Sequence, residues 1–230
     1  MSPLWWRTIL SEGNSLNGTE KVRNVLRGLL QRYGTENIKR RLWNHEYRRG
    51  RWNCLDSMAD DCVYTHIENH AKKGSILDLG CGPGAVGTEL NAAAYHSYNG
   101  VDICDVAIEK ARSRAEENGR TGKNAYFQSD ILSYVPKQCY DVIFFGDSIY
   151  YFSRQRITEI LNRYSKYLKR DGVFIVRTWT MKDEHQTIVH NIENDFDVVE
   201  RHPYAESRIV VIVFRPTGSR REGAKKGDHS

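Results

Sequence analysis

The sequence has few prolines, few cysteines and no long hydrophobic run. Only 5 Pro and 5 Cys occur in 230 residues. No apolar stretch approaches the roughly 20 residues of a membrane-spanning helix. The opening MSPLWWRTIL has too short an apolar stretch, and no small-residue cleavage pattern, for a signal peptide. We therefore expect a chain without a transmembrane segment, located in the cytoplasm.

The cysteines and histidines show no spacing typical of a metal site. The cysteines are odd in number, scattered and without a CxxC pair: Cys54, Cys62, Cys81, Cys104 and Cys139. None of the 8 histidines is paired with a cysteine at ligand spacing. We expect reduced thiols and no metal.

Charge is unevenly distributed within the overall +5. Residues 21–51 hold ten Lys and Arg against Glu36 and Glu46, a local net charge of +8. This basic segment is interpreted first as a solvated helix face that docks on the acidic remainder of the chain. The alternative is a docking surface for an acidic partner such as RNA or a phosphorylated substrate.

The hydrophobic pattern predicts an N-terminal helical segment followed by alternating strands and helices. Helices are expected at 21–33, 36–48 and 57–72, the first with Val22, Leu26, Leu29, Leu30 and Tyr33 on one face. Strands are expected at 75–80, 98–104, 125–130, 140–147 and 173–180, and helices at 85–96, 105–119 (with Asp105 as its N-cap), 153–172 (with Leu168 on its inner face) and 182–194. Segments 197–206 and 208–216 are expected to form a closing antiparallel pair. Alternating strand–helix units predict a parallel sheet with ligands at the carboxyl ends of its strands.

The stretch LDLGCGPGAVG carries Gly80, Gly82 and Gly84 between the first strand and its helix. Glycines here permit a tight turn and let a ligand lie against bare backbone. The spacing also satisfies the dinucleotide pattern G-x-G-x-x-G/A, with Asp102 about 20 residues later. A nicotinamide cofactor therefore remains an alternative on the glycines alone.

Two further acids favour a different cofactor. Asp78 lies two residues before the first glycine, where a pyrophosphate-binding loop needs no carboxylate but a cationic amino-acid group does. Asp130 ends the third strand, where it can meet an adenine amino group.

With these motifs, residues 74–215 resemble the class I S-adenosylmethionine (SAM) dependent methyltransferases. LDLGCGPG, VDIC, SDIL and YDVIFFGD occur in the order that the family shows. The resemblance implies an α/β, Rossmann-like class I methyltransferase fold. Its seven-stranded, mostly parallel sheet would have an antiparallel last strand and an N-terminal helical lid.

The resemblance also implies which residues bind the cofactor. Asp102 would accept hydrogen bonds from both ribose hydroxyls, Ile103 would pack on the adenine, and Asp130 with the Ile131 backbone would read the adenine edge. The remaining residues implied near the methionine portion are Tyr47, Asp78, Gly80, Cys81, Gly82, Gly146 and Asp147. The product would be S-adenosylhomocysteine.

An aromatic pattern precedes the glycine loop. Trp43, Tyr47, Gly50 and Trp52 form W-x3-Y-x2-G-x-W, similar to bacterial small-molecule methyltransferases, including relatives of N-methyltransferases of amino sugars. The resemblance implies a helical lid over cofactor and acceptor; the alternative is plain packing against the body.

Candidate acceptor-side residues follow the fourth and fifth strands. Tyr150 and Tyr151 are candidates because an aromatic face attracts a sulfonium and a hydroxyl can orient an amine. His185 is the candidate base, and Trp179 lies nearby in sequence. Helical geometry makes it improbable that both tyrosines face one pocket.

The sequence thus predicts a SAM-dependent methyltransferase that acts on a nitrogen or oxygen of a small molecule. The rivals are an RNA or protein methyltransferase that docks through the basic segment, an NAD-dependent enzyme, and a catalytically silent SAM-binding subunit. The expected divisions are a loosely ordered 1–20, a basic helical lid at 21–73, the SAM-binding domain at 74–216 and a disordered basic tail at 217–230. The sequence indicates neither the acceptor nor the oligomeric state.

Overall fold

The computed structural model describes residues 18–56, 61–181 and 183–218. Its helices are α2 (Gly18–Tyr33), α3 (Glu36–Arg48), α4 (Val63–Ala71), α5 (Ala85–Glu89), α6 (Asp105–Glu117), α7 (Arg154–Ser165) and α8 (Asp183–Asp195), with short 3-10 turns at Asn53–Asp56 and Ile149–Tyr151. Its strands are β1 (Ser75–Leu79), β2 (Ser97–Asp102), β3 (Asn124–Gln128), β4 (Tyr140–Gly146), β5 (Leu168–Trp179), β6 (Asp197–Tyr204) and β7 (Ile209–Arg215).

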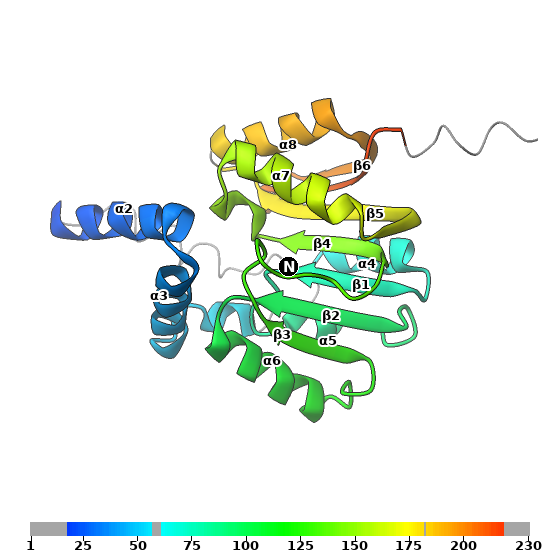
Figure 1. The fold of residues 1–230 in the computed structure, drawn as a ribbon, viewed down its shortest axis with the longest axis horizontal. Helices are drawn as coiled ribbons and strands as arrows, with labels where there is room; N and C mark the ends of the chain where they lie inside the picture. The colour runs from blue at the N-terminus through cyan, green and yellow to red at the C-terminus, as the bar shows by residue number, and fades with distance from the viewer. Residues whose placement is uncertain (1–17, 57–60, 182, 219–230) are drawn as a thin grey trace, which may run out of the picture.

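The strands form one seven-stranded sheet in the order β3-β2-β1-β4-β5-β7-β6. The first five run parallel, and β7 is antiparallel to both β5 and β6. Figure 1 shows the arrowheads of β1, β2 and β4 pointing toward α3. The predicted Rossmann-like fold, with its mostly parallel sheet and closing antiparallel pair, is confirmed.

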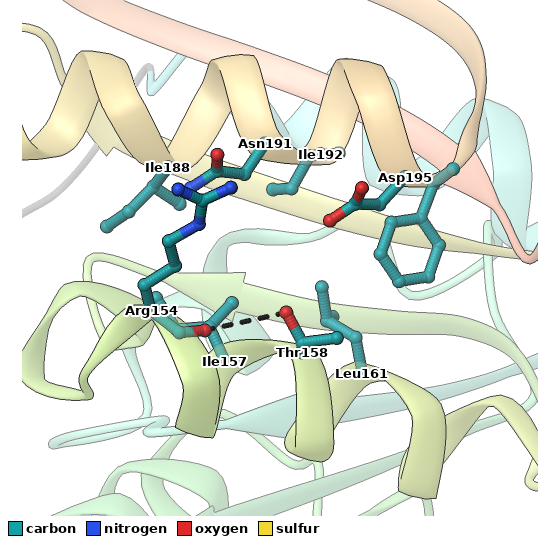
Figure 2. A pocket seen from close by; sticks show the side chains of 9 residues that line it. Arg154, Ile157, Thr158, Leu161, Ile188, Asn191, Ile192 and Asp195 are labelled. Carbon is teal, nitrogen blue, oxygen red and sulfur yellow. Dashed lines mark hydrogen bonds between the residues drawn. The ribbon is translucent and has the colours of Figure 1, made fainter.

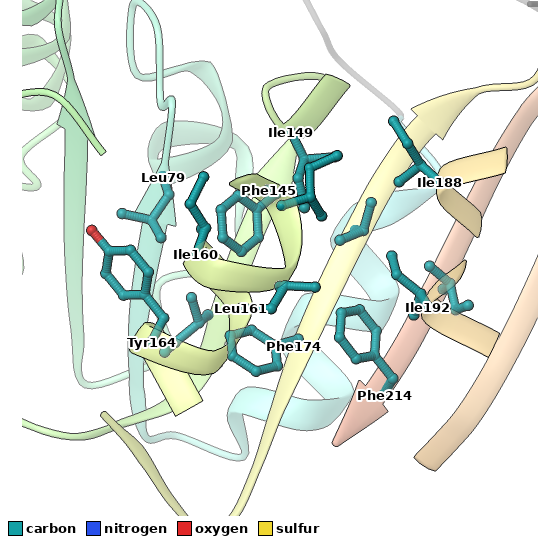
Figure 3. Packing of buried hydrophobic residues seen from close by; sticks show 14 of the residues in the cluster. Leu79, Phe145, Ile149, Ile160, Leu161, Tyr164, Phe174, Ile188, Ile192 and Phe214 are labelled. Atoms are coloured by element: carbon teal, nitrogen blue, oxygen red, sulfur yellow. The ribbon is translucent and has the colours of Figure 1, made fainter. Parts of the chain in front are cut away.

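Helices cover both faces of the sheet. On one face, α7 and α8 pack their apolar side chains against β1, β4 and β5, and Phe145 and Phe174 lie at the centre of this layer (Figure 3). On the other face, α4 and α6 pack against β2, β4 and β7. Burial on both faces explains why β4 reads as a continuous hydrophobic run rather than an alternating one.

Several predicted boundaries are wrong. The helix expected at 85–96 ends at Glu89. The helix expected at 153–172 ends at Ser165, and Leu168 already belongs to β5, since a bulged β4–β5 pairing extends that strand backward. Asp105 is the first residue of α6 and not its N-cap, because its carboxylate instead accepts from Arg40.

Helices α2 and α3 lie beyond the carboxyl ends of the parallel strands (Figure 1). Arg40 of α3 makes two hydrogen bonds of 2.8 and 2.7 Å to Asp105 of α6. The apolar residues predicted to share one face of the first helix are solvent-exposed in large part: Val22, Leu26, Leu29 and Tyr33. The docking of this segment therefore depends on α3 more than on α2.

The described part of the chain contains no helix with both the length and the apolar character needed to cross a bilayer. Most of the segment expected to be loosely ordered and most of the expected basic tail lie outside the described residues. The 21–73 and 74–216 divisions remain predictions.

Candidate functional site

The glycine loop joins β1 to α5 at the centre of the carboxyl edge. Gly80, Gly82 and Gly84 all have positive φ, at 90°, 52° and 77°. A Cβ at Gly80 would lie 2.4 Å from the Ser148 Cβ, and one at Gly84 would lie 2.8 Å from the Ala111 Cβ. Each glycine is thus required twice, by its backbone conformation and by close packing.

Asp102, at the end of β2, connects the loop to the neighbouring strand. Its two carboxylate oxygens accept hydrogen bonds from the backbone N–H groups of Gly82, at 2.9 Å, and Cys104, at 2.8 Å. Burial outweighs these hydrogen bonds and raises the pKa of Asp102 to about 6. A carboxylate has about four acceptor sites, so two remain for further donors such as vicinal hydroxyls.

Asp78 lies buried in β1, directly before the loop. Tyr98 donates a hydrogen bond to its Oδ2, while its Oδ1 is buried without a partner among the described residues. Burial raises the pKa of this carboxyl to about 7. An unpaired buried carboxylate oxygen is costly, and a cationic ligand group would satisfy it.

The adenine-side residues lie at the ends of β2 and β3. Asp130 is buried, and its Oδ1 accepts from the Leu132 backbone N–H at 2.9 Å. Ile131 packs into the core beside α7. The carbonyl of Ile103 accepts from the Gln128 side chain at 3.2 Å. These contacts fix the turn after β3 relative to the end of β2.

Helix α3 places Tyr47 over the glycine loop. Tyr47 is buried with Cys104 and Ala107, and its hydroxyl lies 3.0 Å from the position that a Cβ on Gly82 would take. The neighbouring Cys81 is buried, and burial raises the pKa of its thiol well above the usual value. Tyr47 thus covers the loop at Gly82, whereas the Cys81 thiol packs into the core beside Gly100 and is not a nucleophile at neutral pH.

The end of β4 carries a buried ion cluster that the sequence did not reveal. Asp147 has a positive φ of 51°, and its carboxylate pairs with Arg177 of β5. Arg177 also pairs with Asp61 at 2.9 Å, although 116 positions separate these residues. The Arg177 side chain is 2% exposed, so the cluster fixes the end of β4 to the segment that precedes α4.

Asp147 has an unpaired carboxylate oxygen, as its predicted role near the methionine portion of the cofactor requires. Its Oδ1 is buried and has no partner among the described residues. Gly146 precedes it, and a Cβ there would lie 2.7 Å from the Phe144 ring. The role of both residues at the methionine end stays a prediction.

The acceptor-side candidates form one continuous aromatic contact. Tyr151 meets Trp43 of α3 edge-on, with ring centroids 5.0 Å apart, and Tyr150 lies 4.8 Å from Tyr151. Tyr150 stacks on His185 at 4.5 Å. The two tyrosines therefore point to different neighbours: Tyr151 to the N-terminal helices and Tyr150 to α8.

His185 is buried, although it lies in the first turn of the largely polar helix α8. Its Nδ1 lies 3.1 Å from the Trp179 carbonyl oxygen. A carbonyl only accepts, so Nδ1 carries the hydrogen, and in the neutral ring the lone pair lies on Nε2.

Two hollows lie elsewhere on the molecule. A crevice between α7 and α8, lined by Arg154, Ile157 and Asn191 among others, has room of about 10 Å³ (Figure 2). That is space for about one water molecule. A more open hollow of about 630 Å³ lies between α8 and the β6–β7 turn. Neither is lined by a predicted cofactor residue.

The residues at the carboxyl edge fit the predicted cofactor. Asp102 retains acceptor sites for two hydroxyls, and Asp78 and Asp147 each have an unpaired buried oxygen that a cationic group would satisfy. The sequence predicted these residues from the family motifs. It missed Arg177 and Asp61, because a buried arginine inside a strand and an aspartate far upstream form no motif.

Known proteins resemble this chain in sequence and in fold. A methyltransferase domain family matches residues 70–210. Ubiquinone biosynthesis O-methyltransferase of Rickettsia canadensis is 27% identical over 146 residues, 62% of this chain and 60% of that protein. The mRNA cap guanine-N(7) methyltransferase of Cryptococcus neoformans is 28% identical over 116 residues, 45% of this chain and 19% of that protein. The chain thus spans 60% or less of the length of these curated relatives.

Among solved structures, the N-methyltransferase NodS of Bradyrhizobium japonicum in complex with S-adenosylhomocysteine is similar. The match has a TM-score of 0.59 and 17% identity, and it covers 76% of this chain and 99% of NodS. The predicted methyltransferase fold, and the prediction of SAM as the cofactor at the level of the family, are confirmed. The chain belongs to the methyltransferase domain family.

Proposed function

We propose that this chain transfers a methyl group from SAM to a nitrogen or oxygen of a small molecule. The observation that carries the proposal is the row of aromatic side chains that runs from Trp43 of α3 through Tyr151 and Tyr150 to His185 of α8. When bound, SAM supplies an activated methyl group on a sulfonium. The chain then has to position the acceptor and exclude water.

The cofactor half of the proposed site is assigned to the carboxyl ends of β1, β2, β3 and β4. Asp102 binds the ribose hydroxyls, and a carboxylate suits them because each of its oxygens can accept a second hydrogen bond. Asp78 and Asp147 supply negative charge to the ammonium end, and Asp130 with the Ile131 backbone binds the adenine edge. The unpaired oxygens of Asp78 and Asp147 support this assignment.

The acceptor half is assigned to Tyr150, Tyr151 and His185. Tyr151, against Trp43, provides an aromatic wall that favours a cationic neighbour. His185 takes the proton from the acceptor at Nε2 when the acceptor arrives protonated, and the hydrogen bond to Trp179 together with stacking on Tyr150 holds its ring. The Trp43–Tyr151 contact closes the N-terminal helices onto the turn after β4, which favours a small acceptor over a folded one.

Calorimetry and a turnover screen test this function together. We expect SAM to bind with micromolar affinity, NAD(H) not to bind, and methyl transfer to appear with amines or hydroxyl compounds of small size. Binding of NAD(H) without SAM would refute the cofactor assignment. SAM binding without turnover of any acceptor would instead support a silent SAM-binding subunit.

The RNA alternative rests on the basic N-terminal segment. Arg40 and Arg32 of that segment already pair with Asp105 of α6 and Glu184 of α8, which supports the interpretation as intramolecular docking. Arg41, Arg48 and Arg49 are exposed. If the alternative holds, RNA binding falls steeply with salt and is lost on charge reversal at Arg41, Arg48 and Arg49. Absence of RNA binding at low salt excludes it.

A further inference from the structure

A cluster of histidines and a glutamate lies away from the proposed methyl-transfer site. Helix α4 contributes His66 and His70, which are four residues apart and so share one helix face. Strand β6 contributes Glu200 and His202, which are two residues apart and so share one strand face. Because β6 is the last strand in the sheet order, this cluster lies at the sheet edge, whereas the glycine loop lies between β1 and β2.

The separations in the cluster match those of a coordinated ion. Glu200 Oε2 lies 3.4 Å from His66 Nδ1 and 3.1 Å from His202 Nε2. Ligand atoms of all three residues lie within 4.8 Å of one another. Tetrahedral zinc with bonds of about 2.0–2.1 Å holds neighbouring ligand atoms about 3.3 Å apart.

The surrounding groups orient these atoms as supporting residues of metal sites do. His66 Nε2 lies 2.8 Å from the Tyr204 hydroxyl, which leaves Nδ1 directed toward Glu200. His70 Nε2 lies 3.0 Å from Glu200 Oε1, the oxygen not shared by the other two histidines. A metal-bound imidazole commonly uses its second nitrogen for such a hydrogen bond, and ligating carboxylates are themselves hydrogen-bonded.

The cluster is also open to solvent on one side. The side chains of Glu200 and His202 are 36% and 43% exposed, so an ion can enter from solvent.

We propose that His66, Glu200 and His202 bind one divalent transition-metal ion of the zinc type, with water completing the coordination. Two imidazole nitrogens and one carboxylate form a donor set that suits Zn²⁺, Co²⁺ and Ni²⁺. His70 and Tyr204 position the ligands. The ion links α4 to the edge strand β6 and stabilises the fold without taking part in methyl transfer. Sequence spacing did not indicate this site, because α4 and β6 are more than 120 residues apart.

Titration of the chelator-treated full chain with ZnCl₂ and CoCl₂ tests the proposal. We expect one ion per chain by calorimetry, and cobalt absorption bands in the visible range from low-symmetry coordination. Thermal unfolding in Zn²⁺ at 100 times the dissociation constant should shift upward by about 5–10 °C. Binding should weaken as the pH falls through the histidine range, since protonated imidazoles do not ligate.

Matched variants distinguish zinc binding at this site from non-specific zinc binding by exposed histidines. Glu200→Gln and His202→Gln should each weaken zinc binding at least about 10-fold and remove the thermal shift. His96→Gln and His190→Gln change exposed histidines outside the cluster and should leave both unchanged. Circular dichroism of each metal-free variant establishes folding, and the more exposed His202→Gln decides the outcome if Glu200→Gln does not fold. Absence of saturable binding, or equal zinc affinity in His202→Gln and His96→Gln, overturns the proposal.

Discussion

The two halves of the carboxyl edge are built in different ways. On the β1–β2 side, Asp102 accepts from the backbone of Gly82 and Cys104, residues no more than 20 positions away. On the β4–β5 side, Arg177 pairs with Asp61 across 116 positions, and Tyr151 of the turn after β4 meets Trp43 of α3. The β1–β2 part of the cofactor half is thus held by short-range contacts, whereas Asp147 and the acceptor half take their positions only when distant segments pack.

This difference predicts which half of the carboxyl edge tolerates amino-acid substitutions. Backbone N–H groups hold the cofactor half, so most substitutions outside the glycines and acids leave its geometry intact. Side chains from four elements hold the acceptor half, so single substitutions there alter stability and shape together. The predictions below test this contrast, from the largest expected effect to the smallest.

Arg177→Met should cause the largest loss of stability. The substitution leaves Asp61 and Asp147 as buried carboxylates without their cation. Removing one partner of a buried ion pair costs about 3–5 kcal/mol in the free energy of unfolding. Urea denaturation measures it. The control is Arg156→Met, whose pair with Glu159 is about half exposed and should cost less than about 0.5 kcal/mol. Equal losses in the two variants would show that the ion cluster does not hold the β4–β5 half.

Asp102→Ala should weaken SAM binding by one to two orders of magnitude. Lost charge-assisted hydrogen bonds are worth about 1.5–3 kcal/mol, which gives that factor. Calorimetric titration of the folded variant measures the affinity. Asp171→Ala, an exposed aspartate near the amino end of β5, is the matched control and should bind as the unaltered protein does. Unchanged affinity in Asp102→Ala refutes the ribose assignment.

Asp78→Asn should flatten the dependence of stability on pH. The pKa of Asp78 is about 7 in the folded state, whereas an unfolded aspartate has a pKa of about 3.9. Between about pH 4 and pH 7 the folded state therefore binds more protons than the unfolded state, and stability falls as pH rises.

The asparagine variant lacks this fall, so its stability relative to the unaltered protein should be higher at pH 8 than at pH 5, by up to about 4 kcal/mol. Urea denaturation at pH 5 and pH 8 gives the comparison for both proteins. Parallel pH profiles would mean that Asp78 titrates normally and that burial does not perturb it.

Removal of the Trp43–Tyr151 contact should have the smallest effect. Edge-on aromatic pairs contribute about 0.5–1.5 kcal/mol beyond the area that they bury. A double-mutant cycle with Trp43→Leu and Tyr151→Leu measures the coupling free energy. Tyr151→Phe keeps the ring and should retain the coupling. A coupling near zero would show that contacts with α6, such as Arg40–Asp105, hold α3 without help from the Trp43–Tyr151 pair.

Much of the fold was predictable because its signals are local. The strands of the parallel sheet have short apolar runs, and Gly80, Gly82 and Gly84 mark the turn that a ligand-binding loop requires. The misplaced boundaries have tertiary causes. The chain from Leu168 to Gly172 continues a helical pattern, but pairing of β5 with β4 draws it into the sheet. Arg40 likewise takes the Asp105 carboxylate away from a capping role.

By itself, the sequence determined the strand–helix alternation, the glycine loop and the candidate acids of the cofactor half, because short local patterns of residues mark each of them. Only the tertiary structure decided that Tyr151 meets α3 while Tyr150 stacks on His185, and that Arg177 joins Asp61 to Asp147. It alone brought His66 beside Glu200 and His202. The physical reason is that side-chain chemistry acts over a few ångströms in space, and folding brings residues more than a hundred positions apart within that range.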